Sequence, residues 1–247
     1  MQNSALAALA AATTVAVGAL LHVAPGTASA HQAFVIPAPA ADETAKTGGM
    51  LHTAVFAGGC FWGVQGVFQR VQGVTQAVSG YAGGAKETAT YEMIGSGRTG
   101  HAEAVKITYD PTKVSYAQLL HIFFSVAHDP TQLDRQTPDV GPQYRSAIFY
   151  ADAAQKQTAE RYIAQLDSAK AYPEKIVTEL APLQAKPFYS AEEYHQDYLT
   201  LHPRQPYIAT YDLPKIANLQ KLFPKAYRER PALVTAKAQA LAGRAAP

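Results

Sequence analysis

Residues 57–69 read AGGCFWGVQGVFQ and span the change from a short strand to a helix. The residues before Cys60, TAVFAGG at 53–59, form an apolar run that ends in two glycines, which is typical of a buried strand followed by a turn. After Cys60, apolar side chains recur at the three- and four-residue spacing of one helix face, at Val64, Val67, Phe68 and Val71. The stretch therefore predicts a strand, a tight turn at Cys60 and a helix.

Strands and helices continue to alternate along the rest of the chain. Further strands are predicted over residues 73–84, 101–110, 144–151 and 175–183. Further helices are predicted over residues 115–128, 153–169 and 190–199. The last of these begins with Ser190 and Glu193 at the spacing of a capping box. The pattern predicts one α/β or α+β domain of two layers, a sheet against helices.

The two ends of the chain differ from the domain between them. Residues 1–30 predict a secretory signal, because the first 41 residues hold no Asp, Glu, Lys or Arg and the small residues before Ala30 suit signal peptidase. We expect cleavage after Ala30 and a periplasmic or secreted protein without membrane contact. An uncleaved membrane anchor is the less favoured alternative. Residues 31–50 are predicted to be a linker, 51–225 the folded domain and 226–247 a loose C-terminal extension.

Composition and charge exclude several classes of function. The formal net charge is only +2 and the chain has no block of basic residues, which argues against nucleic acid or an anionic membrane as the main partner. The sequence has no His-Glu-x-x-His or paired-cysteine pattern, and His121 and His128 are seven residues apart, so we predict no metal site. We expect a monomer.

Cys60 is the only cysteine in the 247 residues, so the chain cannot form an internal disulfide. In an exported protein an odd cysteine is either a free reactive thiol or a small buried apolar residue without chemistry. Its predicted place at the N-terminus of a helix favours the thiolate, because unpaired amides and the helix dipole stabilise an anion there. The sequence therefore predicts a nucleophile with a lowered pKa.

Three more side chains are predicted to border Cys60. Phe61 and Trp62 follow it directly and are expected to form the apolar walls of a small pocket, although both rings could instead belong to the core. In the strand at 101–110, Glu103 shares one face with Val105 and Ile107, which points its carboxyl group inward. A buried carboxyl held neutral near pH 7 can donate a proton in catalysis. The alternative is a glutamate at a strand end with its carboxylate in water.

Five motifs of this sequence resemble, in order, those of the peptide methionine sulfoxide reductases of the A type. They read GGCFWGVQ, VSGYAGG, TYEMIGSGRTGHAEAVKITYDP, HDPTQLDRQTPDVGPQYRS and PFYSAEEYHQDYL. The match extends from about Ala54 to Pro224, and the order and spacing of several motifs make it specific. The resemblance implies a two-layer sandwich with a mixed sheet, helices packed on it and a ferredoxin-like core. It also identifies residues 51–225 as a methionine sulfoxide reductase catalytic domain.

The resemblance implies a reaction and its main groups. The family reduces the S epimer of methionine sulfoxide, free or in oxidised proteins and peptides, without a metal or flavin. Cys60 would attack the sulfur, and Glu103 would protonate the sulfoxide oxygen. Phe61 and Trp62 would hold the methyl group of the substrate.

Four further residues receive roles from the same resemblance. Tyr91 and Tyr144 would assist at the sulfoxide oxygen, and Asp139 would line the substrate site. His195 lies in a family motif, so it is also a candidate for the substrate site. The alternative for His195, which we favour, is a hydrogen-bonded histidine with a packing role.

The chain departs from many members of the family in one respect. Those members carry further cysteines near the C-terminus, whereas LHPRQPYIATYDLPK at 201–215 has none, and Tyr207 there has no assigned role. We therefore expect that attack leaves Cys60 as a sulfenic acid and that an external thiol, such as a thioredoxin-like protein, reduces it.

Two other functions fit parts of the sequence. A cysteine hydrolase would pair Cys60 with His101, His128 or His195. A non-catalytic module could recognise oxidised methionine without reducing it. Replacement of Cys60 by serine separates these, because a binding module would keep its function.

Overall fold

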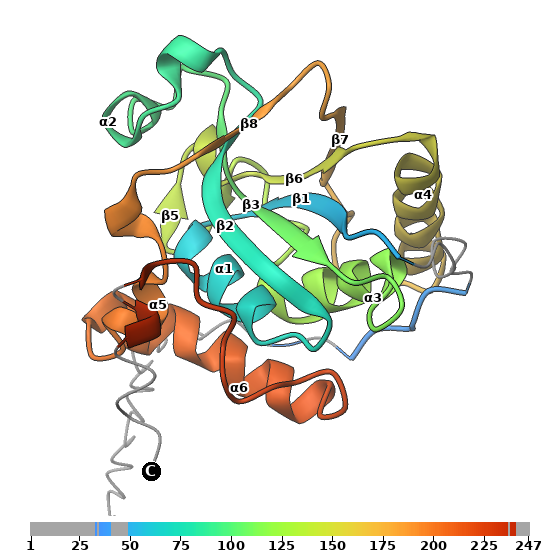
Figure 1. Cartoon of the computed structure of the whole chain (residues 1–247). Helices are drawn as coiled ribbons and strands as arrows, with labels where there is room; N and C mark the ends of the chain where they lie inside the picture. The colour runs from blue at the N-terminus through green and yellow to red at the C-terminus, as the bar shows by residue number, and fades with distance from the viewer. Residues whose placement is uncertain (1–32, 34, 41–48, 237, 241–247) are drawn as a thin grey trace, which may run out of the picture.

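The computed structural model describes residues 33, 35–40, 49–236 and 238–240 (Figure 1). The predicted signal sequence and much of the predicted linker lie outside the described residues. Within the described part of the chain, no helix is both long enough and apolar enough to cross a bilayer.

A six-stranded sheet forms the centre of the molecule, with the strand order β7-β6-β1-β3-β2-β8 (Figure 1). Its strands are β1 (His52–Gly58), β2 (Val74–Ala82), β3 (Ala102–Tyr109), β6 (Ser146–Tyr150), β7 (Glu179–Pro182) and β8 (Phe188–Ser190). The β6–β7 pair is parallel and the other pairs are antiparallel, so the sheet is mixed, as predicted. A separate hairpin, between β3 and β6 along the chain, pairs β4 (Arg135–Gln136) with β5 (Asp139–Val140).

Helices surround this sheet. The α-helices are α1 (Phe61–Gln69), α2 (Tyr91–Ile94), α3 (Tyr116–Ile122), α4 (Ala153–Ser168), α5 (Tyr198–Leu201) and α6 (Leu213–Leu222). Three short 3₁₀ helices are η1 (Lys86–Thr88), η3 (Pro142–Tyr144) and η4 (Glu193–His195). Two π-helical segments are η2 (Phe123–Ala127) and η5 (Ile208–Asp212). Ser115 caps α3 with its hydroxyl group, as the sequence predicts.

The order of the elements confirms the predicted ferredoxin-like core. Along the chain, β1, α1, β2, β3, α3 and β6 follow one another, and in the sheet the four strands lie in the order β6-β1-β3-β2. This is the split βαβ arrangement of ferredoxin-like folds. It brings the C-terminal end of β1 and the start of α1 next to β3, which is where the candidate site forms.

Side chains on the two faces of the sheet form two clusters. The larger cluster joins Phe56 and Val105 to side chains of α1, α3, η2 and α4, and the rings of Phe56 and Phe123 stack at 4.8 Å. The smaller cluster, on the other face, is mostly alanine and is covered by Leu183 and Phe188. Both faces of β3 are therefore buried near its start, so an inward side chain there is removed from water.

One predicted helix is wrong. Residues 190–199 contain the end of β8, the turn η4 and only the start of α5, and Ser190 pairs with Gly80 in the sheet instead of capping a helix. The side chain of Gln196 bonds to the backbone of Ser79, and Asp197 takes a left-handed φ of 58°. These long-range bonds hold the segment in an extended path, which overrides the local capping signal.

The described parts of both termini lie against the domain. Ile36 is buried, and the Tyr162 hydroxyl group donates a 2.8 Å hydrogen bond to the Pro37 carbonyl group, so residues 35–40 lie along α4. In the C-terminal segment, the Thr235 amide and hydroxyl groups donate to the Asp197 carboxylate at 2.8 Å. The described part of this extension is thus anchored, which differs from the loose tail predicted from composition.

Candidate active site

Cys60 lies where the sequence predicts, in the turn between β1 and α1. Gly59 before it has φ +84°, and a Cβ atom there would lie 2.5 Å from Gln136, so only glycine fits this close approach. The Cys60 side chain is 8% exposed. It is therefore a largely covered thiol at the beginning of a helix.

The predicted lowering of the Cys60 pKa is wrong for the protein without substrate. Burial raises the pKa of the thiol well above its usual range, and the charges of Glu103, Asp212 and Asp139 raise it further. The Trp62 amide opposes this change, as expected at a helix N-terminus, but it does not outweigh burial and three nearby acids. The resting thiol is consequently protonated at neutral pH.

Glu103 points inward from β3 and is 3% exposed, which confirms the face predicted from the strand pattern. The antiparallel register pairs Phe56 with Val105. Two residues further along both strands, the same register places Glu103 opposite Gly58. The Phe61 amide donates a 3.0 Å hydrogen bond to the Glu103 carboxyl group. Burial nevertheless raises the Glu103 pKa to about 8, so this group is largely protonated at pH 7.

The two aromatic residues after Cys60 have different environments. Phe61 is 1% exposed and belongs to the core, where its ring lies 5.1 Å from the His195 ring. Trp62 is partly exposed, and its ring stacks on Tyr198 at 3.9 Å with 10° between the planes. The Trp62 indole N–H donates to Nδ1 of His195 at 3.2 Å. Trp62 thus forms a fixed wall beside Cys60, and His195 holds it.

Tyr91 and Tyr144 come to the same site from separate elements, α2 and η3. Burial raises the pKa of both phenols, and the charges of Glu103 and Cys60 raise them further. The Tyr91 ring also lies 4.4 Å from the His195 ring. Both phenols stay protonated and can therefore donate hydrogen bonds.

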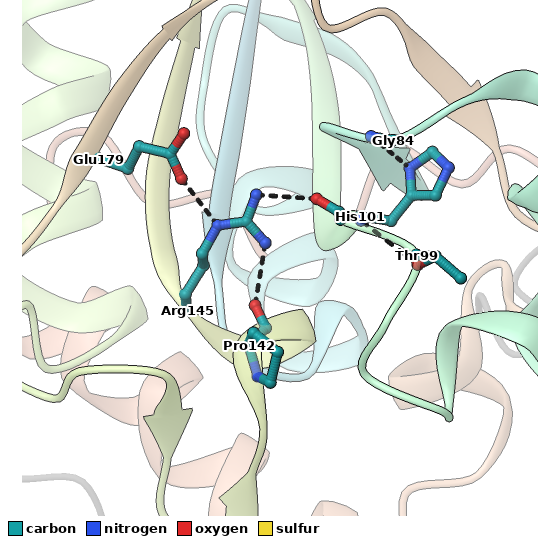
Figure 2. Close-up of polar contacts among 7 residues, drawn as sticks. Gly84, Thr99, His101, Pro142, Arg145 and Glu179 are labelled. Carbon is teal, nitrogen blue, oxygen red and sulfur yellow. Dashed lines mark hydrogen bonds and ion pairs between the residues drawn. The ribbon is translucent and has the colours of Figure 1, made fainter.

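Arg145, which the sequence analysis does not identify, connects Tyr144 to the sheet (Figure 2). Its guanidinium group donates to the carbonyl groups of Pro142 at 2.9 Å and Gly100 at 3.1 Å, and to the Glu179 carboxylate at 2.8 Å. It thereby ties η3, which carries Tyr144, to the backbone just before β3, which carries Glu103. No local pattern marks Arg145, because its partners lie far apart in the sequence.

Asp139 and Tyr207 form a pair that lines a small cavity together with Cys60. The Tyr207 hydroxyl group donates to the Asp139 carboxylate, which gives Tyr207 a structural partner that the sequence does not reveal. Burial raises the pKa of Asp139, and the hydrogen bond from Tyr207 and the charge of Lys215 counter this effect. Asp139 thus lies beside Cys60, and its role at the substrate site stays a prediction.

A buried ion pair, Asp212 with Lys215, completes this part of the site. The two residues are 0% and 5% exposed, and 3.2 Å separates the Lys215 ammonium nitrogen from the nearer Asp212 carboxylate oxygen. The other oxygen of Asp212 has no hydrogen-bond partner among the described residues. The sequence analysis did not find this pair, although Asp and Lys three residues apart across a proline was a possible signal.

The three histidines considered for a cysteine hydrolase are engaged elsewhere. His101 accepts from the Gly84 amide at 3.2 Å, as Figure 2 shows, and its other ring nitrogen lies 2.9 Å from the Ala85 carbonyl oxygen. A ring nitrogen of His128 lies 2.7 Å from the Ser146 hydroxyl group. His195 accepts from Trp62. This arrangement disfavours a Cys–His pair, and among the described residues no group of three or more His, Cys, Asp or Glu could hold a metal ion.

A model of the peptide methionine sulfoxide reductase family matches residues 52–227 of the chain. The chain belongs to this family. Peptide methionine sulfoxide reductase MsrA 2 of Mesorhizobium japonicum is 63% identical to this methionine sulfoxide reductase over 193 residues, which cover 78% of this chain and 97% of that protein. The protein of the same name from Synechocystis is 46% identical, with 76% of this chain and 88% of that protein covered.

Solved structures agree with this assignment. Reduced Mxr1 from Saccharomyces cerevisiae is 30% identical, with a TM-score of 0.56 over 65% of this chain and 91% of that one. Methionine sulfoxide reductase A of Corynebacterium diphtheriae is 32% identical, with a TM-score of 0.54 over 68% of this chain and 93% of that one. The protein is therefore a methionine sulfoxide reductase of the A type, an enzyme whose family repairs oxidised methionine.

Proposed function

We propose that this enzyme reduces the S epimer of methionine sulfoxide, with Cys60 as the nucleophile and Glu103 as the acid. The observation that carries the proposal is the Glu103 carboxyl group, which burial keeps protonated near neutral pH at the N-terminus of the helix that follows Cys60. A sulfoxide oxygen is a poor leaving group until it is protonated or hydrogen-bonded. A neutral carboxyl group supplies that proton, and a carboxylate would not.

The remaining groups act on the same substrate. Tyr91 and Tyr144 are protonated phenols that donate hydrogen bonds to the developing charge on oxygen. Trp62, held by Tyr198 and His195, faces the methyl group and helps to select the epimer. Phe61 supports this wall from the core.

The first half of the reaction transfers one oxygen atom. Cys60 sulfur attacks the sulfoxide, the sulfur–oxygen bond of the substrate breaks, and the products are methionine and the sulfenic acid of Cys60. The thiol must lose its proton during this step. The positive sulfur of the bound sulfoxide favours that loss, because an adjacent positive charge lowers a thiol pKa.

The second half of the reaction needs an outside reductant. Cys60 is the only cysteine in the chain, so a second protein thiol cannot come from the same molecule. We propose that an external thiol, such as a thioredoxin-like protein, forms a mixed disulfide with Cys60 and then releases it. We also propose that the enzyme acts as a monomer on oxidised proteins, peptides and free methionine sulfoxide.

Mass spectrometry after one equivalent of an S-sulfoxide peptide, without reductant, tests the proposal. We expect one added oxygen on Cys60 and an equal amount of reduced peptide. The R epimer and the Cys60→Ser variant are the controls, and neither should give reduced peptide. Reduction without oxygen on Cys60, or an acyl group trapped on Cys60 by an ester, would overturn it.

Export is a separate proposal. It is supported by the uncharged apolar run before Ala30 and the small residues at positions 28 and 30. N-terminal sequencing of the protein from its host should start at residue 31, and a retained residue 1 would contradict it.

A further inference from the structure

A small cavity of about 50 Å³ lies beside Cys60, between the β4–β5 hairpin and the start of α6. Cys60 and Lys215 both line it, together with Asp139 and Tyr207. A cavity of this size holds one to a few water molecules. An oxygen atom or a single sulfur fits here, next to both the Cys60 side chain and the Lys215 ammonium group.

The charge around Cys60 makes its regeneration difficult. Glu103, Asp139 and Asp212 all raise the pKa of its thiol through their negative charges. A thiolate that approaches Cys60 meets the same repulsion from Asp139 and Asp212, whereas Glu103 is largely neutral at pH 7. Of the side chains that line the cavity, Lys215 is the one cation, and it also lowers the pKa of Asp139 and of Asp212.

Burial and a hydrogen bond to Asp212 hold the Lys215 side chain in this position. Asp212, on η5 just before α6, accepts one hydrogen bond from its ammonium group, and the described residues give that group no second partner. Two of its three N–H donors thus remain for an occupant of the cavity. Gly63 on α1 allows the pair to approach, because a Cβ atom there would lie 2.1 Å from the Asp212 carboxylate and 2.8 Å from the Lys215 nitrogen.

We propose that Lys215, oriented by Asp212, is the proton donor that releases the oxygen of the Cys60 sulfenic acid when an external thiol attacks. This inference rests on the proposed function, because it needs the sulfenic acid that the first half of the reaction produces. It assigns the two halves of the reaction to different proton donors. Glu103 serves the sulfoxide, and Lys215 serves the reductant.

The chemistry balances with one proton from Lys215. The thiolate of the reductant attacks Cys60 sulfur, a sulfur–sulfur bond forms, and the bond from Cys60 sulfur to oxygen breaks. Hydroxide is a poor leaving group, since the pKa of water is about 15.7, but with a proton from the ammonium group it leaves as water. The Cys60 sulfur is reduced, the reductant sulfur is oxidised, and Lys215 regains its proton from solvent.

The test measures the two half-reactions separately in the same preparation of full-length enzyme. Single-turnover formation of methionine without reductant reports the first half. Loss of the preformed sulfenic acid on adding dithiothreitol, followed by mass spectrometry, reports the second. In Lys215→Gln we expect the second rate to fall by about 100-fold, the usual contribution of a positioned acid, and to fall much more than the first rate, which loses only the charge that balances Asp212.

Matched variants separate proton donation from structural support. Lys215→Arg keeps the charge and hydrogen-bond donors, but a guanidinium group does not give up its proton, so this variant should keep the fold while its second rate stays low. Lys221→Gln removes an exposed lysine from the same helix and should leave both rates unchanged. Asp212→Asn/Lys215→Met removes both charges, so it avoids an unpaired buried carboxylate if Lys215→Gln does not fold.

Each outcome decides the proposal. Selective loss of the second rate in Lys215→Gln or in the double variant supports it. Equal rates for sulfenic acid reduction in wild type and these variants overturn it, and so does an equal loss of both half-reactions. If wild-type enzyme forms no methionine in a single turnover, the proposed function fails first.

Discussion

At the scale of single residues, burial sets the chemistry of the site. Cys60 and Glu103 are both nearly inaccessible, so burial raises the cost of charging each group, and a charged Glu103 raises that cost further for Cys60. The unliganded enzyme therefore holds a protonated thiol beside a largely protonated carboxyl group. The sequence correctly predicts that Glu103 points inward, because strand alternation places it on the same face as Val105 and Ile107. It does not predict the neutral thiol, because the acids at 139 and 212 reach Cys60 only in the folded chain.

Replacement of Glu103 by glutamine should change two reactions of Cys60 in opposite directions. Above the Glu103 pKa of about 8 its carboxylate is charged and raises the pKa of the thiol, so Glu103→Gln should lower that pKa and speed alkylation by iodoacetamide at about pH 9. The variant cannot donate a full proton to the sulfoxide, so methionine formation should fall by about 100-fold.

The measurements are the alkylation rate over a pH series and single-turnover methionine formation. Glu192→Gln, which changes an acid that bonds to the Tyr81 hydroxyl group and the Tyr91 amide, is a matched control for alkylation. General damage to the site would not speed one reaction while slowing the other. Unchanged alkylation together with normal reduction would contradict the role of Glu103.

At the scale of elements, the strand pattern predicts most of the fold. β1, β2, β3 and β6 and the helices α1, α3 and α4 appear where periodicity places them, because each buries one regular set of apolar side chains. Residues 190–199 fail because Gln196 bonds to the backbone of a distant strand. Arg145 and the Asp212–Lys215 pair were missed for a similar reason, since their meaning depends on contacts between elements.

Arg145 leads to a prediction at this scale. It bonds to η3, to the backbone just before β3 and to β7 (Figure 2). Because η3 carries Tyr144 and β3 carries Glu103, these bonds position one relative to the other. Lysine keeps the charge, but its single ammonium nitrogen cannot reach all three acceptors that the planar guanidinium group binds. In Arg145→Lys we expect kcat to fall by about 10-fold, with a smaller effect on KM, because a small misplacement of a catalytic group costs this much or more.

Steady-state kinetics with a sulfoxide peptide and a thermal melt check this prediction. Arg230→Lys, at an exposed position in the C-terminal segment, is the control and should be unchanged in both. If Arg145→Lys keeps full kcat, Arg145 supports only the stability of the loop, and Tyr144 is positioned by other contacts.

At the scale of the whole molecule, the C-terminal segment is connected to the site through Asp197. The Asp197 carboxylate accepts hydrogen bonds from Thr235 of the C-terminal segment and, at 2.6 Å, from the Gln69 amide group on α1. Asp197 directly precedes α5, and Tyr198 on α5 stacks on Trp62. The C-terminal segment thus helps to fix Trp62, the side chain proposed to face the substrate.

Asp197→Asn should weaken both the fold and this wall. Asparagine tolerates the left-handed backbone at this position, so the change isolates the lost acceptor oxygen. With at least one buried donor left unpaired, we expect the free energy of unfolding to fall by about 2 kcal/mol. The KM for the sulfoxide should rise more than kcat falls, because Tyr198 no longer fixes Trp62, whose fluorescence should shift to longer wavelength. Trp62 is the only tryptophan, so that emission reports this site alone.

Thr235→Val is the control, because it removes a single hydroxyl donor to Asp197, and it should show a smaller effect of the same sign. If Asp197→Asn changes neither the free energy of unfolding nor the Trp62 emission, the C-terminal segment does not support the site.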